Sequence, residues 1–217
     1  METEKQKFKE MTLGGKLEHT WEYYKLALLG ITLGVALIVY IVMRIVMPDP
    51  ESILNVTLVN AYPQAGMNGN VFERYLTEQG YNPKKETIAV NAGLYLGTEM
   101  ANPTNATVVQ ALLAMTLVGE IDLLAGDAGI IDMIGSGNGF LEIDEVLPAE
   151  LLEKYQDSLY TVTAPESGEE YVCAIRLPKG NPLEQDGYYE ADVVAGIPYT
   201  AQHPEMAREM LLYLLGE

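Results

Sequence analysis

Cysteine and histidine are scarce in this sequence. Its 217 residues include one cysteine, Cys173, and two histidines, His19 and His203. A single cysteine cannot form a disulfide within the chain, so the fold must depend on a hydrophobic core, and Cys173 is expected to be buried in an apolar strand. Zinc-ligand spacings, a Walker loop, a GxGxxG motif and a nucleophile elbow around Ser136 are all lacking. We therefore expect no metal, no cofactor and no enzymatic activity.

Basic residues are also scarce after residue 47. Residues 48–217 contain 26 acidic and 7 basic side chains, a net charge of −19. Such a surface repels nucleic acid and anionic headgroups, because binding these polyanions requires clustered lysine and arginine. We therefore expect no nucleic-acid partner. The ordinary effect of this charge is to keep an exported domain soluble.

One long hydrophobic run stands out against this polar background. From Leu26 the chain reads LALLGITLGVALIVYIVM without a charge, followed by Arg44 and three more apolar residues. About 20 apolar helical residues cross a hydrocarbon core of roughly 30 Å. The run exceeds the hydrophobic region of a signal peptide, and no A-x-A cleavage site follows it. The sequence predicts an uncleaved transmembrane helix over residues 26–47, in contact with the lipid bilayer.

Lysines on one side of this run predict its orientation. Residues 1–25 contain five lysines, whereas Arg44 is the one basic residue within about twenty positions on the other side. The rule of positive charge on the inside places residues 1–25 in the cytoplasm. Residues 48–52 then form a linker, and residues 53–217 form an extracellular domain of a single-pass cell-membrane protein.

Gly30 and Gly34 form a GxxxG pair within the hydrophobic run. Small residues at this spacing let two transmembrane helices approach closely, which would produce a homodimer. The alternative is that both glycines are simply tolerated in a helix that faces lipid.

Short apolar segments with the periodicity of strands alternate with segments that have the periodicity of helices through the rest of the chain. Strands are expected at residues 53–59, 87–90, 121–125, 159–163, 171–177 and 191–197, and helices at 71–76, 107–118, 128–134, 148–155 and 204–215. The helix at 107–118 is apolar enough to be buried. This alternation predicts an α/β sandwich with a largely parallel sheet.

Three segments resemble a known family. ALLAMTLVGEIDLLAGDAGIIDMI, GFLEIDEVLP and GIPYTAQHPEMAREMLLYLL are similar to parts of bacterial extracellular solute-binding proteins of the type 2 periplasmic-binding fold. EHTWEYYK before a membrane helix also resembles the start of small membrane-anchored proteins of Gram-positive Clostridia. The resemblance covers residues 107–217 and implies a membrane-anchored, truncated relative whose domain corresponds to one lobe of such a protein.

The chain departs from that family in one respect. The family's second lobe, about a hundred residues long, lies between the third strand and the closing helix, and ligand is held between the lobes. Here only residues 140–192 are available for it. A complete two-lobed clamp is therefore not expected.

Candidate ligand contacts lie around the expected third strand. Asp122 and Asp127 bracket it, and ligands of parallel α/β sheets gather outside the carboxyl ends of strands. Gly126 and Gly129 would expose main-chain N–H groups beside Asp127. The structural alternative is that Asp127 caps the following helix within a turn.

Tyrosine is the most frequent aromatic residue, with fourteen copies against three phenylalanines. Tyr95 and Tyr188 lie in turn-rich stretches, where rings with a polar tip suit ligand binding. The first hypothesis is a solute-binding-like accessory module that serves a transporter permease or another envelope protein. The alternatives are an envelope hydrolase with Asp122 and Asp127 as paired carboxylates, and a structural subunit of a membrane complex.

Overall fold

The computed structural model describes residues 12–46, 49–62, 70–97, 105–164, 168–190 and 192–217. Residues 1–11, Met47, Pro48 and Ala191, which belong to segments expected above, lie outside this range. The chain divides into two compact units, Met1–Asp49 and Pro50–Glu217, and each is described by itself.

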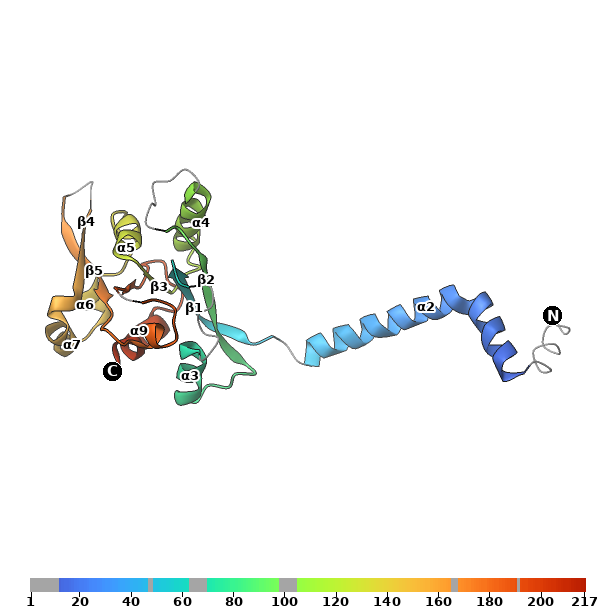
Figure 1. The fold of residues 1–217 in the computed structure, drawn as a ribbon. Coiled ribbons are helices and arrows are strands. Elements are labelled where there is room, and N and C mark those ends of the chain that lie inside the picture. The colour runs from blue at the N-terminus through green and yellow to red at the C-terminus, as the bar shows by residue number, and fades with distance from the viewer. Residues whose placement is uncertain (1–11, 47–48, 63–69, 98–104, 165–167, 191) are drawn as a thin grey trace. The chain divides into compact units, whose positions relative to one another are not determined.

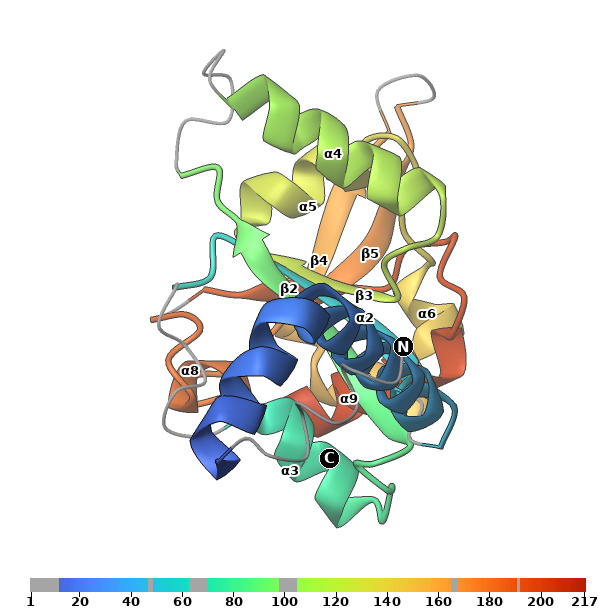
Figure 2. The ribbon, with the colours of Figure 1, turned by 90° about the vertical axis from the view of Figure 1, so that its right-hand side faces the viewer.

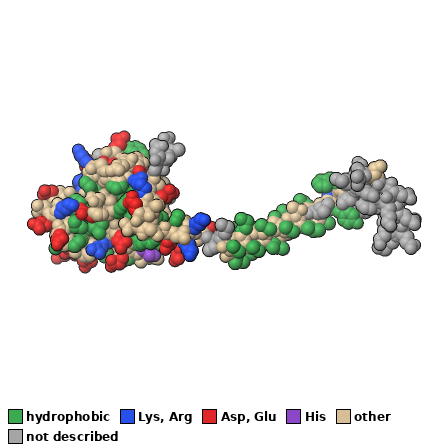
Figure 3. All heavy atoms as spheres, turned by 90° about the horizontal axis from the view of Figure 1, so that it is seen from below, with side chains coloured by type: hydrophobic (Ala, Val, Ile, Leu, Met, Phe, Trp, Pro, Cys, Tyr) green, Lys and Arg blue, Asp and Glu red, His purple; other side chains and the backbone are tan. Residues whose placement is uncertain are grey.

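The first unit contains the helix α2, Leu13–Val46. Its segment Tyr24–Val46 has 23 residues and a mean hydropathy of 2.7, long and apolar enough to cross a membrane. Apolar side chains line the helix (Figure 3), and Leu33 and Ile38 are each 62% exposed. Since hydrocarbon in water is unfavourable, this surface requires an apolar surrounding. One apolar helix compatible with a single-pass anchor is thus present near the N-terminus.

Gly30 and Gly34 lie one turn apart on α2, and both are exposed. A Cβ atom added at either glycine would have no neighbour within 4 Å. The surface at this pair is therefore open, and the homodimer through the helix stays a prediction.

The second unit is built on one six-stranded sheet. Its strands follow the order β2-β1-β3-β6-β5-β4 (Figure 1), with bounds β1 Glu51–Val59, β2 Glu86–Leu94, β3 Leu123–Gly126, β4 Leu159–Thr163, β5 Glu170–Arg176 and β6 Val194–Gly196. The strands β1, β2 and β3 are parallel, whereas β6, β5 and β4 pair antiparallel with their neighbours. The α/β class is confirmed, but the expectation of a largely parallel sheet is wrong.

The antiparallel half arises from the chain between β3 and β6. The strands β4 and β5 form a hairpin, and β6 then returns beside β3 in the opposite direction. A hairpin needs only a short connection, whereas each parallel pairing needs a crossover of a dozen or more residues. This stretch therefore extends the existing sheet and does not build a second one.

Helices cover both faces of the sheet (Figures 1 and 2). The helices α4 and α5 lie on one face, and α3 and α9 lie on the other. The helical bounds are α3 Val71–Glu78, α4 Ala106–Leu117, α5 Ala128–Gly135, α6 Ile143–Val146, α7 Ala149–Lys154, α8 Pro182–Gln185 and α9 Pro204–Leu215, with a 3-10 turn η2 at Gln156–Ser158. The second unit is a three-layer sandwich, because each face of the sheet must bury its apolar side chains.

The sheet separates two apolar clusters. Leu54, Val56 and Leu58 alternate along β1 and belong to the cluster beneath α3 and α9, whereas Val59 belongs to the cluster on the other face. Cys173 of β5 is fully buried in this second cluster, and burial raises the pKa of its thiol to about 12. Cys173 is therefore a buried apolar side chain, as the sequence predicts.

The helix α4 is less buried than its composition suggests. Leu112 is fully buried, but Leu117 is 67% exposed and Val118, the residue after the helix, is 63% exposed. The helix carries no charge, so its sequence does not distinguish the side against the sheet from the outer side. The expectation of a buried helix at 107–118 is wrong, because α4 packs on the sheet along one side only.

Two leucine truncations in α4 test this arrangement. Leu112→Ala should lower the free energy of unfolding by about 2–5 kcal/mol because it leaves a cavity, whereas Leu117→Ala should change it by less than about 0.5 kcal/mol. Urea denaturation of residues 50–217, followed by circular dichroism, measures both values. Equal effects of the two substitutions would contradict the exposed position of Leu117.

Candidate functional site at the carboxyl ends of the parallel strands

The parallel strands β1 and β3 lie side by side at the centre of the sheet. The connection after β1 runs through α3 on one face, and the connection into β3 runs through α4 on the other face (Figure 2). In sheets of this kind, ligands bind outside the carboxyl ends of the two strands whose connections diverge. The candidate site therefore lies where β1 and β3 end, at Val59 and Gly126.

Asn60, directly after β1, links the loops at this edge. Its backbone has a positive φ of 61°, and its side-chain oxygen accepts the N–H groups of Leu96 (2.6 Å) and Gly97 (3.0 Å) in the loop after β2. Its amide nitrogen donates to the carboxylate of Asp127, which follows β3. One side chain thus fixes the ends of three strands relative to one another, and nothing in the sequence marked Asn60 beyond its place after a strand.

Asp127 lies at the N-cap position of α5 with its carboxylate exposed. No hydrogen bond from its side chain to the helix is present, and its main-chain oxygen instead accepts the N–H groups of Ile130 and Ile131. These are the first hydrogen bonds of the helix itself, so the expectation that the Asp127 side chain caps α5 is wrong. The carboxylate remains available toward solvent beside a helix N-terminus, where the helix dipole favours negative charge.

The two glycines of the expected site flank Asp127. Gly126 is buried, and a Cβ atom there would lie 3.3 Å from the oxygen of Val59. A side chain at this position would be packed tightly against the end of β1, which would have to shift by a few tenths of an ångström. Gly129 is half-buried in the first turn of α5. The structure thus brings Gly126, Asp127 and Gly129 together at one edge.

Tyr189 is buried beneath the ends of β1 and β3. Its hydroxyl oxygen lies 2.9 Å from the main-chain oxygen of Val59 and 3.1 Å from that of Ala125, so its one hydrogen is shared between two acceptors, and burial raises the pKa of its phenol far above the ordinary value. The neighbouring Tyr188 is only 5% exposed, and its ring packs edge-on against Phe72 with centroids 6.0 Å apart. Tyr188 is therefore a core residue, and its expected ligand contact is corrected; the sequence did not distinguish it from Tyr189.

A surface pocket of about 530 Å³ opens beside Tyr189. Tyr62 and Glu190 line it, together with Gly180, Glu184, Gln185 and Gly187. Glu190 beside Tyr62 raises the pKa of that phenol, with smaller contributions from burial and from Tyr95. Tyr95 is 67% exposed. Aromatic rings with carboxylates suit a small polar or cationic molecule.

Asp122 lies at the opposite end of β3 and is fully buried. Its carboxylate accepts the main-chain N–H groups of Asn55, Gln202 and His203, each at 2.8 Å, and lies 3.0 Å from Nδ1 of His203. Asp122 precedes β3 and Asp127 follows it, so the two carboxylates do not share a cleft. The expected role of Asp122 in ligand binding, and the pair of carboxylates required for a hydrolase, are therefore corrected.

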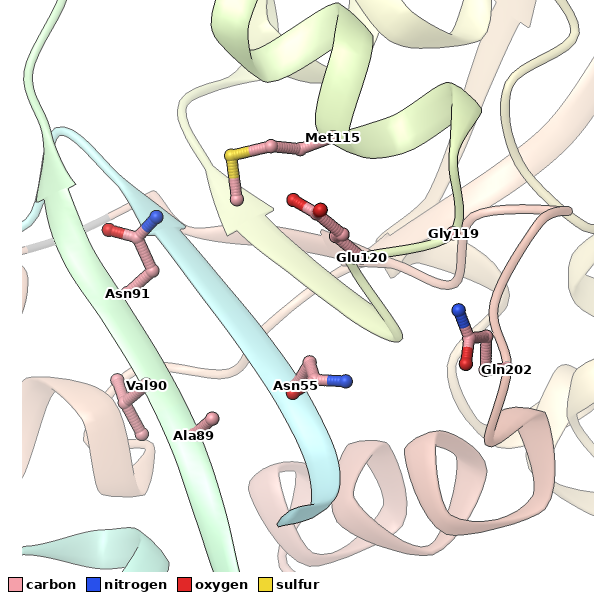
Figure 4. Close-up of a pocket in the computed structure, with 8 residues that line it drawn as sticks. All are labelled: Asn55, Ala89, Val90, Asn91, Met115, Gly119, Glu120 and Gln202. Carbon is pink, nitrogen blue, oxygen red and sulfur yellow. The ribbon is translucent and has the colours of Figure 1, made fainter.

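A second pocket, of about 350 Å³, lies on the α4 face of the sheet near Asp122 (Figure 4). Its lining contains three carboxamides, Asn55, Asn91 and Gln202, besides Glu120, Met115, Ala89, Val90 and Gly119. Among the described residues, no group of three or more potential metal ligands is present. The pocket offers hydrogen-bonding groups of both kinds and one carboxylate.

Comparison of the chain with protein-family models, with curated proteins and with solved structures found no match. The resemblance to solute-binding proteins therefore depends on the short segments quoted above and stays a prediction.

The buried carboxylate predicts a pH-dependent stability. Burial by itself raises the pKa of Asp122, but hydrogen bonds from His203 and Asn55 outweigh it, so the pKa lies below the ordinary 3.8. A lowered folded-state pKa means that the carboxylate's contribution is complete above about pH 4 and is lost as the pH falls through the folded-state pKa. Asp122→Asn should cost about 3 kcal/mol at neutral pH, and this difference should shrink below about pH 4.

Urea denaturation of both proteins at a series of pH values measures that difference. Asp157→Asn, at an exposed aspartate of η2, is the matched control and should leave stability unchanged throughout. A cost for Asp122→Asn that stays constant down to strongly acidic pH would contradict the assigned role of the carboxylate.

Proposed function

We propose that this chain is a membrane-tethered extracytoplasmic binding module, similar to one lobe of a solute-binding protein, that serves a permease or another envelope protein. The apolar helix at Tyr24–Val46 supports the anchor. The five lysines that precede it and the acidic character of residues 48–217 support a cytoplasmic N-terminus and an extracellular domain. In Figure 3, Asp and Glu side chains are spread over the visible face of the domain, among Lys, Arg and hydrophobic side chains.

The position of the inserted chain supports the similarity to a single lobe. In solute-binding proteins the second lobe lies between the third strand and the closing helix. Here the corresponding chain between β3 and α9 forms β4, β5, β6 and short helices on the same sheet. The described part of this stretch therefore adds no second lobe, and in this proposal a ligand or a partner meets the carboxyl ends of β1 and β3 directly.

The Asn60 network carries the proposal of binding. Asn60 positions Asp127 and the loop at Leu96–Gly97, while Gly126 and Tyr189 fix the underlying strands. Preorganised polar groups beside a pocket reduce the entropy that binding costs. We infer that a small polar solute with at least one hydrogen-bond donor or positive charge binds between Asp127 and the pocket of Tyr62 and Glu190.

A ligand screen by thermal unfolding tests this function. The full chain in detergent micelles is heated with amino acids, sugars, polyamines or short peptides, each well above the expected dissociation constant. A bound ligand at about 100 times its dissociation constant should add about 2.7 kcal/mol, which raises the melting temperature by about 5–10 °C.

The variant Asp127→Asn should lose that rise while melting close to the wild type alone, because asparagine keeps an acceptor for Asn60 and loses the charge. Asp157→Asn should keep the rise. If no solute class changes the melting temperature, the ligand-binding form of the proposal is refuted, and the form with a protein partner remains.

A second candidate function, a structural subunit of a membrane complex, is favoured by the outer side of α4. Leu113, Leu117 and Val118 expose apolar surface there, and residues 101–119 carry no charge in a domain of net charge −19. Contiguous exposed apolar surface often marks a contact with another protein.

Co-purification tests this second candidate. The wild type extracted from its own membrane in mild detergent should be recovered with another subunit, and Leu117→Gln should lose it because a polar side chain replaces the apolar contact. Tyr199→Gln, at another exposed apolar side chain, should retain the subunit. Recovery of the wild type as a lone chain would count against obligate assembly.

A further inference from the structure

The strand β2 forms one edge of the sheet (Figures 1 and 2). It pairs with β1 along Glu86–Leu94. In the part of the chain that the structure describes, no other hydrogen bond is recorded for the main chain of Thr87–Ala92. Alternate N–H and C=O groups on the outer side of β2 are therefore open to a further strand.

This edge lacks several of the features that usually prevent strand pairing. Natural edge strands are short, bulged, or interrupted by lysine or proline. The other edge strand, β4, has five residues and a register irregularity at Tyr160–Thr161. In contrast, β2 has nine residues and contains neither a charge nor a proline between Thr87 and Leu94, and its register with β1 is regular from Ile88 to Asn91, with an irregularity on either side of that segment. The edge of β2 is thus suited to accept an added strand.

The two faces beside β2 differ in chemistry. Ile88, Val90 and Ala92 point to the apolar cluster under α3. On the other face, Ala89 and Asn91 border the pocket of Figure 4, where the Glu120 carboxylate extends over the sheet. No hydrogen bond of the Glu120 side chain is recorded within the described ranges, and Glu120 is exposed. An added strand would therefore place alternate side chains against an apolar face and an acidic, carboxamide-lined pocket.

We propose that β2 binds an extended segment of a partner protein by strand addition, and that this segment alternates apolar residues with lysine or arginine. The main-chain hydrogen bonds to β2 provide affinity, and the pocket selects the basic side chain through Glu120 and the carboxamides of Asn91 and Gln202. The surface is distinct from the edge at Asp127, so the inference does not depend on the proposed solute.

Charge favours this occupant over a second copy of the chain. Pairing β2 with β2 of another molecule would bring together two domains that each carry a net charge of −19 over residues 48–217, and Glu86 and Glu120 lie at the contact. Like charges at an interface oppose association. A basic extended segment instead gains attraction from the same field.

Peptide binding to the full chain in nanodiscs of zwitterionic lipid tests the proposal. The probe is a fluorescent octapeptide of alternating valine and lysine, and its controls replace lysine by glutamate or the central valines by proline. Fluorescence anisotropy should give a dissociation constant below about 1 mM for the first peptide and no binding for either control. Hydrogen exchange at Thr87–Asn91 should slow at least about tenfold in the complex, because added-strand hydrogen bonds protect these amides.

Two matched variants distinguish peptide binding through the pocket from non-specific attraction by the net negative charge of the domain. Glu120→Gln should weaken binding of the lysine peptide about three- to fivefold, as expected for an exposed ion pair, and Glu150→Gln on the exposed side of α7 should not. Equal binding of the proline peptide, no protection at Thr87–Asn91, or no binding at all overturns the proposal. If these amides become more protected as the protein concentration rises in the absence of peptide, the edge pairs with a second copy of the chain. That result also overturns the proposal.

Discussion

The buried carboxylate of Asp122 is the interaction on which the rest of the domain depends. It accepts main-chain N–H groups from Asn55 of β1 and from Gln202 and His203 before α9, and it also contacts the ring of His203. Without these donors a fully buried negative charge would be strongly unfavourable. The same bonds fasten the start of α9 to the central strands. The C-terminal helix therefore completes the core beneath β1 only in the arrangement that satisfies this one carboxylate.

The opposite end of the central strands is organised by an uncharged side chain. Asn60 bridges the loop after β2 and the carboxylate of Asp127, and Tyr189 holds the ends of β1 and β3 from below. The two ends of β3 thus have different roles, although each carries an aspartate. The carboxylate of Asp122 is buried and hydrogen-bonded within the fold, whereas the carboxylate of Asp127 faces solvent. The proposed solute site requires an exposed carboxylate of this kind.

Negative charge limits where this domain makes contacts. Its acidic residues keep most of the surface hydrated and repel other anionic molecules. Among the described residues, the outer side of α4, with Leu117 and Val118, carries no charge, and the free main-chain edge of β2 has no charged residue from Thr87 to Leu94. These two surfaces and the Asp127 edge come from different elements of the sheet. A tethered module with separate surfaces for a solute and for a partner is consistent with an accessory role beside a permease.

The sequence by itself determined what local patterns encode. The bounds of β4 and α9 agree with the expected 159–163 and 204–215, and the apolar helix, the α/β class and the burial of Cys173 also follow from composition and periodicity. Only the tertiary structure decided the direction of β6 and the exposed side of α4. It also decided that Asp127 is exposed while Asp122 is buried, and that the hydroxyl of Tyr189 bonds to main-chain oxygens while the ring of Tyr188 packs against Phe72. Hydrophobic periodicity and turn residues reflect interactions among near neighbours in the sequence. These outcomes instead depend on partners that are distant in the sequence and meet only in the folded sheet: Asn55 and His203 for Asp122, Asn60 for Asp127, and Val59 for Tyr189.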